Sequence, residues 1–165
     1  PEGIPLDAKL HLDVEAAKSL MDGARLIVIN SPGNPTGAVE SRESIQAIAE
    51  YAEDAGVTVV SDEVYEHFIY GPSHHSPATY SDDVITVNAA SKTYAMTGWR
   101  LGYLAGPKEY TAQCLKVHQY CQACASSISQ YAALAGYTGP HECVHQMRDE
   151  FRRRRDYLYG ALREM

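Results

Sequence analysis

Leu26-Ile27-Val28-Ile29-Asn30 and the second run Val57-Thr58-Val59-Val60-Ser61-Asp62 decide the fold of this chain. Both runs are continuously apolar or β-branched before they turn polar, a pattern typical of strands in a parallel sheet that is covered on both faces. Between them a helix is predicted to begin at Ser41 and to end at Gly56. Its apolar stripe consists of Ile45, Ile48, Ala49 and Ala52. Strand, helix and strand in this order predict a βαβ unit.

The sequence on either side extends this pattern. Upstream, a short helix is predicted over residues 13–21, with Asp13 as its N-cap. Downstream, residues 84–87 and 101–105 predict a third and a fourth strand, and Pro107 stops the last one. Beyond it, helical patterns cover residues 110–120, 126–137 and 141–162. We therefore expect an α/β fold with a mostly parallel sheet and flanking helices.

Length and composition restrict the class of protein. The chain has 165 residues, 45% of them hydrophobic and 21% charged, which fits one globular domain. No apolar run approaches the ~20 residues of a membrane-spanning helix. The net charge of -7 opposes binding to nucleic acid. The basic run Arg152–Arg155 lies among acidic residues and indicates a solvated helix face. We expect small-molecule partners, with no nucleic acid and no membrane.

The cysteines and histidines favour structural roles over metal binding. The cysteines are Cys114, Cys121, Cys124 and Cys143. Cys121 and Cys124 have the spacing of half a zinc site, but no second pair completes it, so we expect buried, reduced thiols in a cytoplasmic protein. Among the histidines, only the His141/His145 pair has helical ligand spacing, and it lacks an obvious third ligand. We therefore predict no metal site.

Each predicted strand runs into a polar loop. Such loops meet at the carboxyl edge of a parallel sheet, where α/β proteins bind their ligands. The loops after the first three strands are Asn30-Ser31-Pro32-Gly33-Asn34-Pro35-Thr36-Gly37, Ser61-Asp62-Glu63-Val64-Tyr65 and Asn88-Ala89-Ala90-Ser91-Lys92. Arg100-Leu101-Gly102-Tyr103 begins eight residues beyond Lys92. We expect these polar groups to converge on one rim.

These motifs, in this order, resemble the fold-type I enzymes that use pyridoxal 5′-phosphate (PLP), and most closely the class I and II aminotransferases. Each motif alone is a weak signal, whereas the combination is specific. The resemblance is strong over residues 13–110. It implies that residues 1–165 form a single partial large domain that binds PLP, without the N-terminal part and the small C-terminal domain of the family.

The resemblance implies catalytic roles for three residues. Lys92 would form the Schiff base with PLP, the internal aldimine, and would later move the proton of the substrate α-carbon. Asp62 would hold the pyridine nitrogen in its protonated form, which keeps the cofactor a strong electron sink. Tyr65 would donate a hydrogen bond to the phenolic oxygen of PLP. The ordinary alternatives are a solvated lysine at a strand end and a capping or turn aspartate.

Three further residues would bind the cofactor. Asn34 resembles the partner of Tyr65 at the phenolic oxygen, with a simple turn residue as the alternative. Arg100 and Ser91 resemble phosphate ligands, with a surface salt bridge as the alternative for Arg100. Some members carry another phosphate-binding serine where this chain has Ala89.

The backbone of these motifs also carries expectations. The Asn34–Pro35 bond is expected to be cis, because the family often has a cis bond there and X–Pro bonds tolerate it. Gly98 and Gly102 are expected to lie close to the cofactor or to a neighbouring strand.

The expected reaction is transamination between an α-amino acid, with aspartate as the first candidate, and a 2-oxo acid such as 2-oxoglutarate. A β-lyase of the same fold and a non-catalytic PLP-binding regulatory domain remain open, because the substrate contacts that separate them lie outside these residues. The resemblance also implies a homodimer in the full-length protein. We expect the segment alone to be weakly active or inactive.

Overall fold

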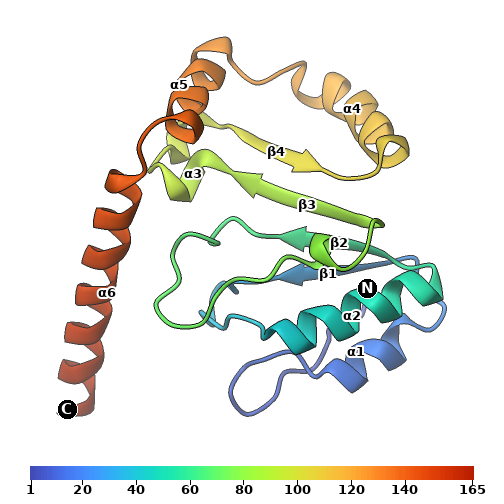
Figure 1. The fold of residues 1–165 in the computed structure, drawn as a ribbon, viewed down its shortest axis with the longest axis horizontal. Helices are drawn as coiled ribbons and strands as arrows, with labels where there is room; N and C mark the ends of the chain where they lie inside the picture. Colours follow the sequence, from blue (N-terminus) through green and yellow to red (C-terminus); the bar gives the residue numbers. More distant parts are fainter.

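The computed structural model describes residues 1–165 and has a four-stranded sheet at its centre (Figure 1). The strands β1 (Leu26–Asn30), β2 (Thr58–Asp62), β3 (Val84–Ala89) and β4 (Gly102–Ala105) lie side by side in sequence order. The first three are parallel, whereas β4 runs antiparallel to β3. The predicted α/β fold with a mostly parallel sheet is confirmed.

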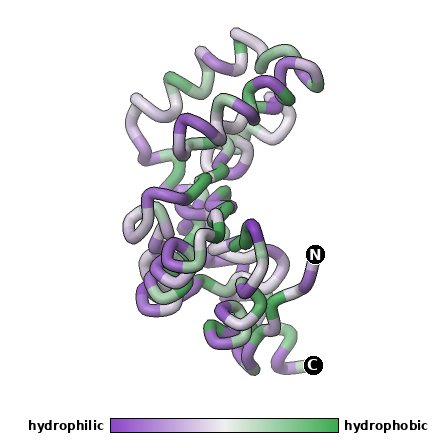
Figure 2. Tube along the Cα trace, turned by 90° about the vertical axis from the view of Figure 1, so that its right-hand side faces the viewer, coloured by the Kyte–Doolittle hydropathy of each residue, from purple (hydrophilic) through white to green (hydrophobic).

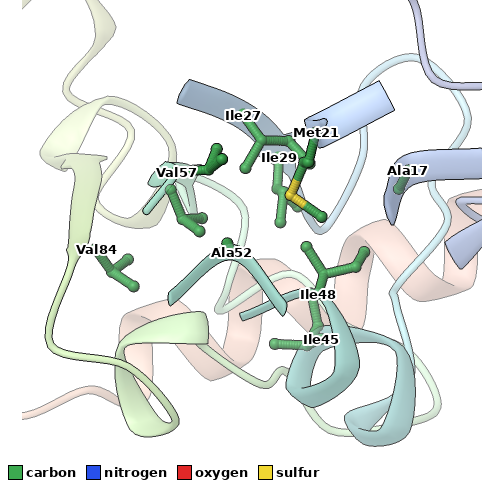
Figure 3. Close-up of a cluster of buried hydrophobic side chains, with 10 residues drawn as sticks. Ala17, Met21, Ile27, Ile29, Ile45, Ile48, Ala52, Val57 and Val84 are labelled. Atoms are coloured by element: carbon green, nitrogen blue, oxygen red, sulfur yellow. The ribbon is translucent and has the colours of Figure 1, made fainter. Parts of the chain in front are cut away.

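One face of this sheet is covered by α1 (Val14–Met21) and α2 (Arg42–Ala55). The predicted caps are present, since Asp13 accepts a hydrogen bond from the backbone of Ala16 and Ser41 accepts one from Ser44. Gly56 ends α2 with φ 66°, in the left-handed region that glycine tolerates best. The core between helices and sheet consists of Ala17, Met21, Ile27, Ile29, Ile45, Ile48, Ala52, Val57, Val59 and Val84 (Figure 3).

The opposite face of β1 is open, so the prediction that both faces are covered is wrong for this strand. Burial alternates along β1: Leu26 and Val28 are 55% and 59% exposed, whereas Ile27 and Ile29 are buried. The reason is that α1 and α2 pack on the same side of the sheet, and no helix of the chain covers Leu26 and Val28. A continuously apolar sequence therefore does not by itself specify what covers each face.

The second half of the chain is mainly helical and lies at the β4 edge and at the carboxyl ends of the parallel strands (Figure 1). Its elements are α3 (Ala90–Thr93), α4 (Lys108–Gln122), α5 (Ser127–Thr138) and α6 (Glu142–Arg163). Two single turns of 3-10 helix, η1 (Pro77–Thr79) and η2 (Thr97–Trp99), connect other segments. The three predicted C-terminal helices are confirmed.

These helices contribute little to the core. In α4 no residue is buried, and in Figure 2 α4 and α5 form a part of the molecule that stands away from the α1–α2 layer. The prediction of buried cysteines is wrong, because Cys121, Cys124 and Cys143 are exposed and Cys114 is half-buried. Helical spacing placed these thiols among apolar residues, but nothing in the chain covers Cys121, Cys124 or Cys143. No helix of the chain combines the length and the apolar character needed to cross a membrane.

Candidate functional site

The carboxyl ends of the three parallel strands bring the predicted polar loops to one edge of the sheet. Asn30, the last residue of β1, is the register partner of Asp62, the last residue of β2. Asp62 is in turn paired with Val87 of β3, and that strand continues through Asn88 into α3. Because parallel strands end together, residues far apart in the sequence become neighbours.

The side chains of Lys92 and Tyr65 lie next to each other at this edge. Lys92 is on the short helix α3, and its Nζ lies 5.6 Å from the centre of the Tyr65 ring. No carboxylate lies within 4.0 Å of Lys92 Nζ, so the amine is not held in an ion pair. Both side chains are half-buried and therefore reachable from solvent.

Asp62 and Asn34 are joined through a residue that the sequence did not single out. The Nδ2 atom of Asn30 donates a hydrogen bond to Asp62 Oδ2 at 3.4 Å, and its Oδ1 atom accepts one from the backbone N–H of Asn34 at 3.2 Å. The other carboxylate oxygen of Asp62 accepts the N–H of Val64 at 3.2 Å. The Asn34–Pro35 bond is cis, as expected, and Ser31–Pro32 is cis as well.

Arg100 and Ser91 are also connected, through Thr97. The Nη1 atom of Arg100 donates to the carbonyl oxygen of Thr97 at 3.0 Å, and Thr97 Oγ1 donates to the carbonyl oxygen of Ser91 at 3.2 Å. No carboxylate lies within 4.0 Å of the guanidinium group, so the predicted alternative of a surface salt bridge is wrong. Most of the guanidinium donors remain available to an anion.

The six predicted residues thus form three linked pairs on one rim and not one contiguous network. No hydrogen bond joins Lys92 to Asp62 or to Arg100. One cavity, of about 580 Å³, is lined by Asn34 and Tyr65, and a second, of about 730 Å³, is lined by Ser91 and Arg100. Asp62 and Lys92 line neither of these cavities.

A buried carboxylate next to Asp62 was missed by sequence reasoning. Glu63 is 4% exposed, and its carboxylate accepts hydrogen bonds from Ser61 Oγ at 2.8 Å and Ser76 Oγ at 2.7 Å, while His74 Nε2 lies 3.0 Å away. Burial raises the pKa of Glu63, but the hydrogen bonds from His74, Ser76 and Ser61 outweigh it, so the pKa lies below its ordinary value. The only signal in the sequence was a charged residue at the end of an apolar strand.

A second missed contact connects the Tyr65 turn with the Lys92 loop. The buried Asn88 donates through Nδ2 to Glu66 Oε1 at 2.6 Å. Glu66, Glu63 and His74 have potential metal-ligand atoms within 4.8 Å of one another. All three side chains already make hydrogen bonds or ion pairs within the protein, so we interpret this cluster as one that stabilises the fold.

The two glycines of the lysine loop differ. A Cβ atom on Gly102 would lie 2.9 Å from the carbonyl oxygen of Asn88, so the predicted close approach to a neighbouring strand is confirmed there. A Cβ atom on Gly98 would meet nothing within 4 Å, so Gly98 has no close neighbour in this chain.

Known proteins are similar to this chain in sequence and in fold. Residues 4–165 match the family described as aminotransferase class I and II. A probable aspartate aminotransferase of Methanocaldococcus jannaschii is 44% identical over 99% of this chain and 46% of its own length. A probable N-acetyl-LL-diaminopimelate aminotransferase of Bacillus subtilis is 41% identical over 99% of this chain and 40% of its own. The chain therefore spans less than half the length of these relatives.

Solved structures of aminotransferases have a similar fold. The aromatic aminotransferase of Pyrococcus horikoshii superposes with a TM-score of 0.93 at 38% identity, over 99% of this chain and 46% of that one. Aspartate aminotransferase of Thermus thermophilus gives a TM-score of 0.92 at 37% identity, over 94% of this chain and 42% of that one. The fold, the site motifs and these matches agree, and the chain belongs to the class I and II aminotransferases, a family of PLP-dependent enzymes.

Proposed function

We propose that this chain carries the cofactor-binding core of an enzyme that transfers an amino group from an α-amino acid to a 2-oxo acid, with PLP as cofactor. Lys92 would hold PLP covalently through Nζ, and Asp62 would bind the pyridine nitrogen. Tyr65 and Asn34 would hydrogen-bond the phenolic oxygen, and Arg100 with Ser91 would bind the phosphate. The observation that carries the proposal is the position of Lys92 Nζ over the Tyr65 ring, at the carboxyl edge of the parallel strands.

The donor and acceptor groups fit PLP. Arg100 has free N–H donors and no acidic partner, which suits a phosphate. Asp62 has no cationic partner and accepts only from amide N–H groups, so one cationic N–H donor would complete its surroundings. Lys92 has no acidic partner that would hold it as an ammonium ion.

Each residue would have a definite task. PLP, when bound, supplies a sink for the electrons of a bond broken at the substrate α-carbon. Asp62 would stabilise the protonated ring nitrogen, on which the strength of that sink depends. Lys92 Nζ would be released by the incoming amine and would then take the proton from the α-carbon. Tyr65 and Asn34 would donate hydrogen bonds to the phenolic oxygen and so spread its negative charge.

The named relatives support aspartate as the amino donor. They include aspartate aminotransferases of Geobacillus stearothermophilus and Pyrococcus abyssi, at 41% and 39% identity, and a probable aspartate/prephenate aminotransferase of Aquifex aeolicus at 40%. We propose 2-oxoglutarate as the acceptor. A β-lyase and a regulatory domain are less favoured, because every one of these relatives is named as an aminotransferase. We also propose a homodimer in the cytoplasm, where four free cysteines would stay reduced.

The test is a titration with PLP, followed by reduction with borohydride and identification of the labelled lysine by peptide mass. We expect a pH-sensitive absorbance band and a label on Lys92, and loss of both in Lys92→Ala. Lys108→Ala is the control, because Lys108 lines the cavity that holds Ser91 and Arg100 but is not the lysine proposed to bind PLP. A label that scatters over surface lysines, or that survives in Lys92→Ala, would contradict the proposal. Amino transfer from aspartate to 2-oxoglutarate is then measured directly.

A further inference from the structure

Asn30 is placed where two parts of the proposed site meet. It ends β1, directly beside Asp62 in the register of the sheet, and the loop that carries Asn34 begins immediately after it. Its amide contacts both: Nδ2 lies 3.4 Å from Asp62 Oδ2, and Oδ1 lies 3.2 Å from the backbone nitrogen of Asn34. Among the side chains of this rim, only that of Asn30 hydrogen-bonds both residues.

The chemistry of the two partners fixes the orientation of the amide. A backbone N–H only donates and an ionised carboxylate only accepts, so the oxygen of Asn30 must face Asn34 and its nitrogen must face Asp62. A side chain that bridges these partners needs one donor and one acceptor at this length. Asparagine has both, whereas aspartate has acceptors alone and alanine has neither.

The bridge complements the remaining contact of Asp62. Val64 donates its backbone N–H to Oδ1 and Asn30 donates to Oδ2, so each carboxylate oxygen is held by one amide N–H group and rotation about the last side-chain bond is restricted. The Asn34 loop is held in turn at its backbone nitrogen. A shift of either residue therefore changes the geometry at the other.

We propose that Asn30 is a positioning residue that sets the distance and orientation of Asp62 relative to Asn34. The inference rests on the proposed function, in which these two residues bind the pyridine nitrogen and the phenolic oxygen on one ring. Both groups must match a rigid ring at the same time, so their mutual placement controls how well it is held. Because both hydrogen bonds are exposed to solvent, Asn30 contributes little to folding, and its variants are expected to fold.

Two variants separate the effects of the two hydrogen bonds that the Asn30 side chain makes. Asn30→Ala removes both contacts. Asn30→Asp keeps an acceptor for Asn34 but places a second carboxylate beside Asp62, and like charges at this distance disfavour the ionised form of both. Thr36→Ala is the matched control, since Thr36 Oγ1 accepts the N–H of Ala38 in the same loop and makes no hydrogen bond to Asp62 or Asn34.

We would measure the dissociation constant for PLP, the pH at which the absorbance of bound PLP changes, and the amide resonance of Asn34 in the cofactor-free protein. We expect Asn30→Ala to bind PLP about tenfold more weakly, the size of one lost hydrogen bond to a charged group, and to shift the Asn34 resonance. We expect Asn30→Asp to leave the Asn34 resonance near its original position, to weaken PLP further and to move the pH midpoint. Thr36→Ala should change the affinity and the pH midpoint little.

The inference is wrong if both Asn30 variants bind PLP as the original protein does, with the same pH midpoint and an unmoved Asn34 resonance. It is also wrong if Thr36→Ala has the same effect as Asn30→Ala, because the loop as a whole would then be responsible. A different result, namely that the original protein takes up no PLP at Lys92, would contradict the proposed function itself. The labelling experiment on the unmodified protein therefore distinguishes the two failures.

Discussion

Replacing Glu63 by alanine should destabilise the protein strongly, because Glu63 is a buried carboxylate with three hydrogen-bond partners. Its carboxylate is the common partner of Ser61, Ser76 and His74, which join the end of β2 to the segment before η1. Glu63 and Ser61 are 4% and 1% exposed, so these hydrogen bonds are shielded from bulk water. Removing one partner of a buried charged pair costs about 3–5 kcal/mol, so Glu63→Ala should lower the unfolding free energy by about 3–5 kcal/mol.

The assay is urea unfolding near neutral pH, followed by circular dichroism, for the original protein, Glu63→Ala and Glu63→Gln. Glutamine keeps one carbonyl acceptor at the same length, so Glu63→Gln should lose only about 1–2 kcal/mol. Glu53→Ala is the control, because Glu53 is an exposed glutamate on α2, and its change should stay within about 0.5 kcal/mol.

The effect should depend on pH in a definite direction. The pKa of Glu63 in the folded protein lies below its ordinary value of 4.5, so the unfolded chain takes up this proton first as the pH falls. The stabilisation from the ionised carboxylate is therefore complete above the ordinary pKa and is lost as the pH falls through the folded pKa. The stability difference between the original protein and Glu63→Gln should narrow in acid. An unfolding free energy for Glu63→Ala within about 0.5 kcal/mol of the original protein at neutral pH would refute the reasoning.

Two further predictions use contacts elsewhere in the chain. Gly102→Ala should lower the unfolding free energy by more than about 1 kcal/mol, because the new Cβ would lie 2.9 Å from a backbone oxygen of β3. Gly98→Ala is the control and should be tolerated, because its Cβ would meet nothing within 4 Å. Equal unfolding midpoints for the two variants would contradict this prediction. On α6, hydrogen bonds from Arg153 and its neighbour Arg154 lower the pKa of Glu150 to about 2. The carboxyl resonance of Glu150 should therefore titrate far below that of an ordinary glutamate. Its pKa should rise in concentrated salt or in Arg153→Gln. A titration of Glu150 that is insensitive to both changes would exclude the ion pair as the cause.

Much of the fold and of the candidate site was predictable because interactions between residues close in the sequence determine it. The stripe of α2 is buried as predicted, and Asp13, Ser41 and Gly56 cap their helices because their side chains or backbone freedom act within a few residues. The predicted residues of the site lie on one rim, since the ends of parallel strands meet wherever the chain folds this way.

The missed contacts depend on residues far apart in the sequence. The bond from Asn88 to Glu66 and that from Ser76 to Glu63 join different segments, and nothing in the local pattern around either partner requires them. The exposed Cys121 of α4 shows the same limitation, because helical periodicity identifies a face without saying whether anything packs on it.

The sequence by itself determined the α/β class, the caps and the order of the site motifs, because these follow from periodicity and from residue chemistry at short range. Only the tertiary structure decided that Asn30 bridges Asp62 and Asn34, that Glu63 is buried among hydroxyl groups, and that Leu26 and Val28 stay uncovered. The physical reason is that strand register and helix placement set these neighbours, and both are fixed by packing of the whole chain rather than by any one segment.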